Sequence, residues 1–240
     1  MENIDLQEIN RLKQIIIMNC TKCRGYGNPC SCQDEFQLEV KKLFANIPSK
    51  YRNFTMDKID SPFVRKARIE VQEYLNDLTE EKEKGRGLYL WSQNKGTAKT
   101  ALACITLIEA LKKGYSAYFT DLDECIAAIM DGWYDEEKRA EFEKKVLHSE
   151  FLVIDDVGGM EIKTKGNTEL ITTVLTTTFR KRSNALRPTI LTSNLPIQDV
   201  DRAFGERLQS SMHEHLRIIE CKGIDYRKDV IAKENKRGKK

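Results

Sequence analysis

Four cysteines near the start of the chain have a spacing suited to metal binding. Cys20 and Cys23 form a C-x2-C pair, and Cys30 and Cys32 form a C-x-C pair after six intervening residues. Four thiolates this close can surround one tetrahedral Zn²⁺ ion at Zn–S distances of about 2.3 Å. Free thiols are the alternative, because disulfides are disfavoured in a cytosolic protein. We expect structural rather than catalytic zinc, since no histidine or carboxylate completes an open site.

A second segment has the form of a phosphate-binding loop that follows a strand and opens a helix. Backbone N–H groups at a helix N-terminus attract phosphate, and a lysine there neutralises the β- and γ-phosphate oxygens of ATP. A following threonine hydroxyl helps to hold Mg²⁺. The residues that we expect at the nucleotide are Asn94, Lys95, Gly96, Thr97, Ala98, Lys99 and Thr100, with Thr100 also at the magnesium.

This loop departs from the usual pattern G-x-x-x-x-G-K-[ST], because Gln93 and Ala98 replace the two glycines. If the backbone at Ala98 needs a positive φ, alanine costs about 1 kcal/mol or more relative to glycine. If that residue is already helical, alanine costs nothing. We expect nucleotide binding in both cases, whereas the pattern leaves the rate of hydrolysis open.

Two further strand ends carry polar residues that suit the same site. Asp155 and Asp156 follow the apolar run 151–154, the form of a Walker B strand, so Asp155 is expected in the Mg²⁺ shell and Asp156 near the attacking water. Asn194 ends the run 189–194 and would contact the γ-phosphate or that water. An ordinary strand that ends in a solvated Asp-Asp turn is the alternative for 155–156.

The elements that must position these residues alternate between strands and helices from Gly87 onward. Apolar runs predict strands at 88–91, 116–120, 151–154 and 189–192, and the intervening patterns predict helices at 99–113, 121–131 and 136–148. Another helix is expected from Ser61-Pro62 to about Thr79. Continuous apolar strands spaced by helices predict an α/β fold with a central parallel sheet flanked by helices on both faces.

Composition and zoning divide the chain into four parts. We expect a zinc-binding module at 1–45, a connector with a helix at 46–86, the ATP-binding domain at 87–230 and a basic tail at 231–240.

A net charge of +3 does not by itself imply nucleic acid. The start of the chain lacks the pattern of a secretory signal, and no run approaches the roughly 20 apolar residues of a membrane span. The expected location is the cytoplasm of a bacterium or phage-infected host, with no membrane partner.

These residues resemble a known family, the DnaC/DnaI helicase loaders. The resemblance rests on the phosphate-loop region and on the stretches 47–60, 152–158, 187–195, 204–208 and 222–227, and it covers most of 46–230. The IstB transposition helpers share much of the same ATPase segment. The resemblance implies an AAA+ P-loop core that self-associates on the hexameric replicative helicase and helps to place it on single-stranded DNA. It also implies that the zinc-bearing N-terminal module grips the helicase.

The resemblance assigns roles to individual positions and exposes one departure. Lys99, Thr100, Asp155, Asp156 and Asn194 fall on ATP-site positions, and Arg227 matches the sensor-2 arginine, which would reach the γ-phosphate. In the segment 205–212, Arg207 is kept but Ser211 stands where the family has its arginine finger. An arginine finger contributes about 10³–10⁵ in rate in GTPases. We therefore expect ATP binding with Mg²⁺ and slow hydrolysis.

The evidence for DNA contact and for one particular partner is weaker. Basic residues at 138–139 and 144–145 lie near Trp133 and Tyr134, which would suit weak, salt-sensitive single-strand binding, but interspersed acidic residues favour a solvated helix equally. A transposase-helper ATPase of the IstB kind is the main alternative function. A nucleotide-gated helicase adaptor or antagonist with little hydrolysis is the other, and Gln93, Ala98 and Ser211 point that way.

Overall fold

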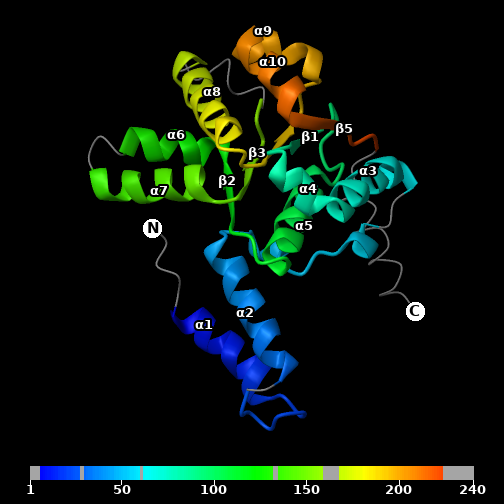
Figure 1. The fold of residues 1–240 in the computed structure, drawn as a ribbon, viewed down its shortest axis with the longest axis vertical. Helices are drawn as coiled ribbons and strands as arrows, with labels where there is room; N and C mark the ends of the chain where they lie inside the picture. Colours follow the sequence, from blue (N-terminus) through cyan, green and yellow to red (C-terminus); the bar gives the residue numbers. More distant parts are fainter. Residues whose placement is uncertain (1–5, 28–29, 60–61, 132–134, 159–167, 224–240) are drawn as a thin grey trace, which may run out of the picture.

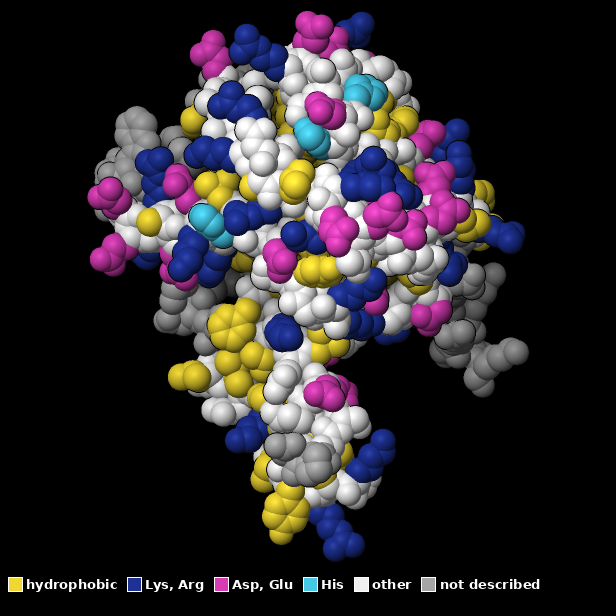
Figure 2. Space-filling view, viewed as in Figure 1, with side chains coloured by type: hydrophobic (Ala, Val, Ile, Leu, Met, Phe, Trp, Pro, Cys, Tyr) yellow, Lys and Arg dark blue, Asp and Glu magenta, His cyan; other side chains and the backbone are white. Residues whose placement is uncertain are grey.

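A computed structural model describes residues 6–27, 30–59, 62–131, 135–158 and 168–223. The chain forms a body around one sheet, from which the N-terminal helices project as an arm (Figure 1). The arm consists of α1 (Leu6–Lys13), the short π-helical turn η1 (Gln14–Met18) and α2 (Ser31–Phe44). Figure 2 shows hydrophobic side chains gathered where this arm meets the body.

The sheet has five parallel strands in the order β2-β3-β4-β1-β5. Their bounds are β1 (Gly87–Trp91), β2 (Ala117–Asp121), β3 (Phe151–Asp155), β4 (Thr189–Ser193) and β5 (Leu216–Glu220). The four strands expected from the sequence are present within about a residue at each end. The fifth, β5, was not expected, because its charged residues Arg217 and Glu220 interrupt the apolar run.

Helices cover both faces of the sheet. The predicted helices appear as α5 (Lys99–Lys112), α6 (Leu122–Asp131) and α7 (Glu136–His148). The structure adds α8 (Thr168–Asn184), α9 (Val200–Phe204) and α10 (Glu206–His215), with a 3-10 turn η6 at Ile197–Asp199. The parallel sheet between helical layers confirms the predicted fold class.

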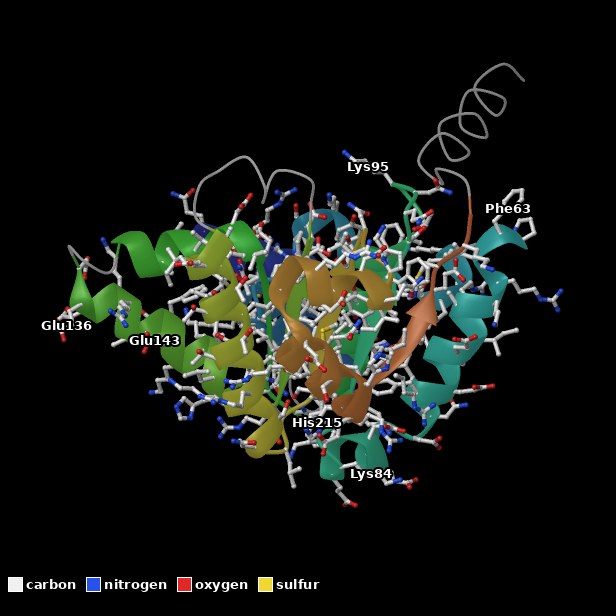
Figure 3. All side chains as sticks on the ribbon, turned by 90° about the horizontal axis from the view of Figure 1, so that it is seen from above. Phe63, Lys84, Lys95, Glu136, Glu143 and His215 are labelled. Atoms are coloured by element: carbon white, nitrogen blue, oxygen red, sulfur yellow. The ribbon has the colours of Figure 1, made fainter. Side chains whose placement is uncertain are left out.

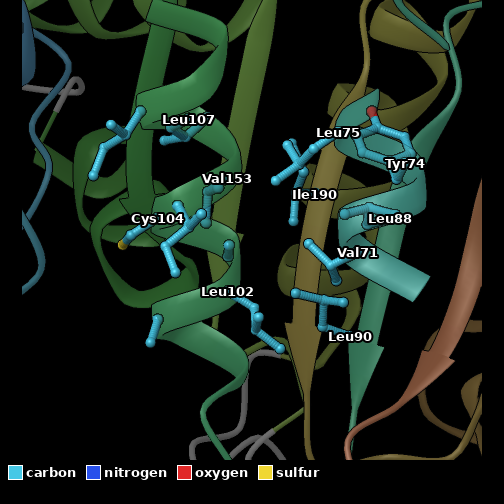
Figure 4. Packing of buried hydrophobic residues seen from close by; sticks show 14 of the residues in the cluster. Val71, Tyr74, Leu75, Leu88, Leu90, Leu102, Cys104, Leu107, Val153 and Ile190 are labelled. Carbon is cyan, nitrogen blue, oxygen red and sulfur yellow. The ribbon is translucent and has the colours of Figure 1, made fainter. Parts of the chain in front are cut away.

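The strands are buried on both sides, and alternate residues enter two separate cores. On β1, Leu88 and Leu90 pack against α5, whereas Tyr89 belongs to the cluster formed with α8 and α10. Figure 4 shows the first cluster, in which side chains of α3, β1 and α5 meet over Val153 and Ile190. Successive strand residues point to opposite faces, so a continuous apolar run supplies both cores at once.

The segment between arm and sheet contributes to the first core. It contains three 3-10 turns, η2 (Ser49–Tyr51), η3 (Met56–Lys58) and η4 (Pro62–Val64), followed by α3 (Arg65–Asn76) and α4 (Leu78–Glu83). Ile47, Ile59 and Val71 are fully buried among the residues of β1 and α5. The single helix expected at 62–79 is divided at Asp77, and its expected cap, Ser61, lies outside the described residues.

The arm is joined to the edge of the sheet by hydrogen bonds to β2. The Phe119 N–H donates to the Ala45 carbonyl at 2.8 Å, and the Asn46 side-chain amide donates to the Phe119 carbonyl at 3.1 Å. These bonds occupy backbone groups that an edge strand leaves open. Asn46 has φ of 56°, a left-handed conformation that asparagine tolerates better than most residues. The end of α2 is therefore fixed to the sheet.

Candidate functional site

The phosphate-loop residues lie between the end of β1 and the start of α5. Lys95 projects from the tip of this loop, away from the body (Figure 3). Lys99 points inward instead, where its ammonium group donates to the Asn94 carbonyl at 3.2 Å and to Asn194 Oδ1 at 3.0 Å. The loop thus places one lysine at the carboxyl edge of the sheet, beside the polar end of β4.

Ala98 caps α5 with a left-handed backbone, at φ 64° and ψ 12°. Of the two alternatives for this residue, the structure has the one in which alanine is costly, since a Cβ in this region crowds the following carbonyl. Glycine would be free of this strain. The neighbouring Thr97 is buried, and its hydroxyl has no hydrogen-bond partner among the described residues.

Asp155 lies opposite the helix that begins at Lys99. The Thr100 hydroxyl is 3.0 Å from Asp155 Oδ1 and 3.1 Å from Oδ2, and the Thr192 hydroxyl donates to Oδ1. Burial raises the pKa of the Asp155 carboxyl above its usual range, and the two hydroxyls oppose that rise. Within the part of the chain that the structure describes, no cation pairs with Asp155. A desolvated carboxylate beside a threonine hydroxyl fits a Mg²⁺ ion.

Asp156 and Asn194 lie at the solvent side of the same edge. The Asn194 amide is 3.4 Å from Asp156 Oδ1, while its oxygen accepts from Lys99. Asp156 is exposed and, like Ala98, has a left-handed backbone, at φ 54°. The structure therefore brings together Lys99, Thr100, Asp155, Asp156 and Asn194. Arg227 lies outside the described residues.

Comparison with known proteins bears on what this edge of the sheet binds. The family model described as IstB-like ATP binding protein matches residues 73–236, which include the phosphate loop and both polar strand ends. The chain belongs to this IstB-like ATP-binding family. The curated protein sequences contain no match.

Three of the solved structures that this IstB-like protein resembles are those of DnaC, DnaI and DnaA. It resembles the DnaC helicase loader, with 28% identity and a TM-score of 0.61 over 72% of this chain and 99% of that chain. DnaI is 18% identical, with a TM-score of 0.60 over 72% of this chain and 93% of that chain. AMPPCP-bound DnaA from Aquifex aeolicus is 23% identical, with a TM-score of 0.56 over 72% of this chain and 50% of that chain. The last two show the fold alone. The IstB-like family and the likeness to DnaC identify an ATP-binding core with the AAA+ fold.

The four cysteines of the IstB-like protein converge at the outer end of the arm. All four Sγ atoms lie within 4.8 Å of one another, with 3.8 Å between Cys20 and Cys30 and 3.5 Å between Cys23 and Cys32. A ZnS₄ tetrahedron with Zn–S bonds of about 2.3 Å has S···S edges of about 3.8 Å. These thiols are unpaired by disulfides, and the cluster fits a zinc ion.

Local backbone geometry favours the thiolate form of one of these cysteines. The Gly27 N–H donates to Cys23 Sγ at 3.2 Å, and this bond is the largest of several hydrogen bonds that lower the Cys23 pKa to about 6. Burial has the opposite effect on Cys32, whose pKa is raised. Gly27 has φ of 77°, and its N–H reaches the sulfur from a turn that residues with side chains rarely adopt. The other three cysteines, Cys104, Cys125 and Cys221, are buried thiols.

The basic residues of α7 are largely paired with acidic neighbours. Ion pairs join Lys138 to Asp135, Arg139 to Glu143 and Lys145 to Glu141. These pairs match the alternative of a solvated helix. Trp133 and Tyr134, the aromatic residues considered with them, lie outside the described residues.

Sequence reasoning assigned no role to Thr192, which contacts both members of the 155–156 pair. It is buried at 1% exposure, and its hydroxyl accepts from the Asp156 N–H at 3.0 Å while donating to Asp155. A threonine near a strand end is common, so its type alone carries no signal. The pairing of β3 with β4, in the register Ile154 with Leu191, is what places Thr192 opposite Asp155.

None of the helices in the described part of the chain combines the length and the apolar character that a membrane span requires.

Proposed function

We propose that this protein is an ATP-binding loader of the replicative DNA helicase, which delivers the hexameric helicase onto single-stranded DNA. The observation that carries the proposal is the meeting of Lys99, Thr100, Asp155 and Asn194 at one sheet edge, in a chain 28% identical to a DnaC helicase loader. The function of the DnaC loader supplies the expected activity, and the site supplies the chemistry.

In this proposal each residue of the edge has one role toward Mg·ATP. The loop 94–98 cradles the phosphates, Lys99 neutralises their β- and γ-oxygens, and Thr100 and Asp155 hold Mg²⁺. The bound magnesium would neutralise charge on the triphosphate. Asp156 orients the attacking water, and Asn194, which already bridges Lys99 and Asp156, registers whether a γ-phosphate is present. Arg227 would add a cation to the γ-phosphate.

Hydrolysis is expected to be slow for three reasons. Asp156 is one methylene shorter than the glutamate usual at this position, Ala98 brings a strained backbone into the loop, and Ser211 supplies no arginine finger. Without a finger, a neighbouring subunit contributes no cation to the transition state. ATP then acts mainly by binding, and self-association on the helicase serves assembly.

The arm is the part that we propose to dock on the helicase. Residues 1–45 form the zinc-binding module, 46–86 connect it to the ATP-binding domain at 87–230, and 231–240 is the basic tail. Leu6, Ile15, Met18, Tyr26 and Phe44 are exposed large apolar residues of the described arm. Exposed apolar side chains gathered on one module are typical of a protein interaction site.

Nucleotide binding is tested by calorimetry with ATP and MgCl₂ on the full chain. Lys99→Ala should abolish most of the binding, because it removes the cation that faces the phosphates. Lys113→Ala is the matched control: this lysine is exposed at the opposite end of α5 and should change affinity little. Equal binding by both variants, or brisk hydrolysis by the protein alone, would contradict the proposal.

The partner is tested by pull-down and unwinding. The full chain is mixed with a replicative helicase, ATP and single-stranded DNA, and complex formation and unwinding are scored. Retention of the helicase with stimulated unwinding supports loading, whereas retention of a transposase supports the IstB-type alternative. Helicase binding that blocks unwinding would indicate an antagonist. Single-strand binding should be weak and fall with added salt.

A further inference from the structure

Thr192 occupies an unusual position between the two carboxylates of the proposed magnesium site. Its single hydroxyl accepts the Asp156 N–H at 3.0 Å and donates its own hydrogen to Asp155 Oδ1. One side chain of β4 thus links two successive residues of β3. At 1% exposure it is too buried to contact a nucleotide. Any effect on chemistry must pass through the aspartates.

The bridge matters because β3 ends abruptly at this point. Asp156 adopts a left-handed backbone, φ 54°, which turns the chain away from the strand direction. The Val157 N–H then donates to the Thr192 carbonyl at 2.8 Å, and the Ser193 hydroxyl donates to the Val157 carbonyl. A non-glycine residue is uncommon in this region and persists where the surroundings hold it. The end of β4 provides that hold.

The Thr100 and Thr192 hydroxyls both contact Asp155, but only the Thr100 hydroxyl is expected to leave it when a metal binds. The Thr100 hydroxyl lies almost equally far from both carboxylate oxygens, 3.0 and 3.1 Å, and in the proposed function it turns to Mg²⁺. The Thr192 hydroxyl contacts Oδ1 from the opposite strand and is held by the Asp156 N–H. It is therefore expected to stay on Oδ1, where it would keep the Asp155 carboxylate oriented for a metal.

We propose that Thr192 is a positioning residue that aims Asp155 at Mg²⁺ and fixes Asp156 beside it. This inference rests on the proposed function, because it concerns the same Mg·ATP site. Hydrogen-bonded partners of metal ligands fix the orientation of those ligands, and their loss costs about 10–100-fold in metal affinity. Thr192 contacts both aspartates through one hydroxyl and does not touch the nucleotide. Its removal should therefore weaken magnesium binding and leave the direct contacts with the nucleotide intact.

The test compares nucleotide binding with and without magnesium in the full chain. A fluorescent ATP analogue is titrated in MgCl₂ and again in EDTA against wild type, Thr192→Val, Thr192→Ser and Thr106→Val. Thr106 is a matched control, because it is a fully buried threonine whose hydroxyl donates to the Leu102 carbonyl of its own helix. Thr192→Val should lose about 10–100-fold in the magnesium-dependent part of the affinity. Its affinity in EDTA should match wild type.

Rescue separates the hydroxyl from packing. Thr192→Ser keeps the hydroxyl and should restore magnesium dependence, and Thr106→Val should leave it unchanged. If Thr192→Val fails to fold, Thr192→Cys gives the same comparison, because a thiol is a weak donor of similar size.

The outcomes distinguish this inference from the proposed function. Wild-type magnesium dependence in Thr192→Val, equal losses with and without magnesium, or failure of serine to rescue would each overturn the role of Thr192 and leave the Mg·ATP site standing. Wild-type protein that binds no nucleotide in either buffer would overturn the proposed function and the role of Thr192 with it.

Discussion

The arm and the sheet edge each gather functional side chains, but different forces hold them. Helix α1 buries no side chain, η1 buries Ile17, and α2 buries Cys32, Lys42 and Leu43. Helix α5, which carries Lys99 and Thr100, buries ten of its fourteen residues. The cysteine cluster therefore has almost no core beneath it, whereas the nucleotide site lies on one of the most buried helices.

This difference indicates how each site depends on its ligand. A module of about 45 residues rarely buries enough apolar surface to fold unaided, so the proposed zinc would supply folding free energy as well as geometry. The ATP edge is formed by packing of the sheet and is expected to persist without nucleotide. Chelation should therefore unfold the arm and spare the sheet, whereas mutations in the sheet's core should destabilise the body and spare the arm.

The largest expected effect is loss of the arm when zinc is removed. Structural zinc binding contributes about 10–16 kcal/mol in zinc-finger peptides. Chelator treatment, or the double change Cys23→Ser with Cys32→Ser, should make residues 6–44 sensitive to protease while the sheet stays resistant. Cys221→Ala is the control, because Cys221 is buried in the first core and should leave the arm intact. Metal analysis that finds no zinc in freshly purified, reduced protein would show that the arm does not depend on zinc.

Next in size is loss of Arg182, which should destabilise the body and spare the arm. This arginine is fully buried and donates to the carbonyls of Val146, Ser149, Glu150 and Pro188 and to the Thr189 hydroxyl. Burial lowers its pKa to about 9. It joins the end of α7 to the starts of β3 and β4.

Arg182→Met removes the guanidinium donor from the Val146, Ser149 and Glu150 carbonyls, which should cost about 3–5 kcal/mol in urea unfolding. Arg180→Met is the matched control, since Arg180 is exposed on the same helix and should change stability by less than about 0.5 kcal/mol. Equal effects of the two changes would show that the buried network stabilises little.

A smaller effect is expected at the phosphate loop. Ala98→Gly removes left-handed strain of about 1–2 kcal/mol, offset in part by the greater entropy of glycine in the unfolded chain. The net gain should be about 0.5–1 kcal/mol by urea unfolding, with nucleotide affinity kept or improved. Ala101→Gly, inside the same helix, should instead destabilise by about 1 kcal/mol. If Ala98→Gly lowered the free energy of unfolding, the backbone at residue 98 would not be strained.

The smallest expected effect concerns a surface contact of the arm. Arg52 pairs with Glu8 of α1 at 2.5 Å, and both side chains are partly exposed. Exposed ion pairs contribute about 0.2–1 kcal/mol. Glu8→Gln should change thermal unfolding within that range, and added salt should reduce the difference. A larger loss would show that this pair, and not the metal, holds the arm in place.

Several elements were predictable because their signals are local. The runs at β1, β3 and β4, the helix that starts at Lys99 and the C-x2-C spacing can all be read without knowledge of neighbours. Strand β5 and helices α8 to α10 were not predicted. Helix α8 carries a run of threonines, which have poor helix propensity, and only its packing over β3 and β4 compensates.

The sequence by itself determined the parallel α/β fold, the phosphate loop ahead of Lys99 and the grouping of the four cysteines, because residue type and spacing along the chain specify them. Only the tertiary structure decided that Ala98 is left-handed, that Arg182 is buried and that Thr192 lies opposite Asp155. These features depend on which strands become neighbours and in what register. That choice is made by packing over the whole sheet, which no short stretch of sequence encodes.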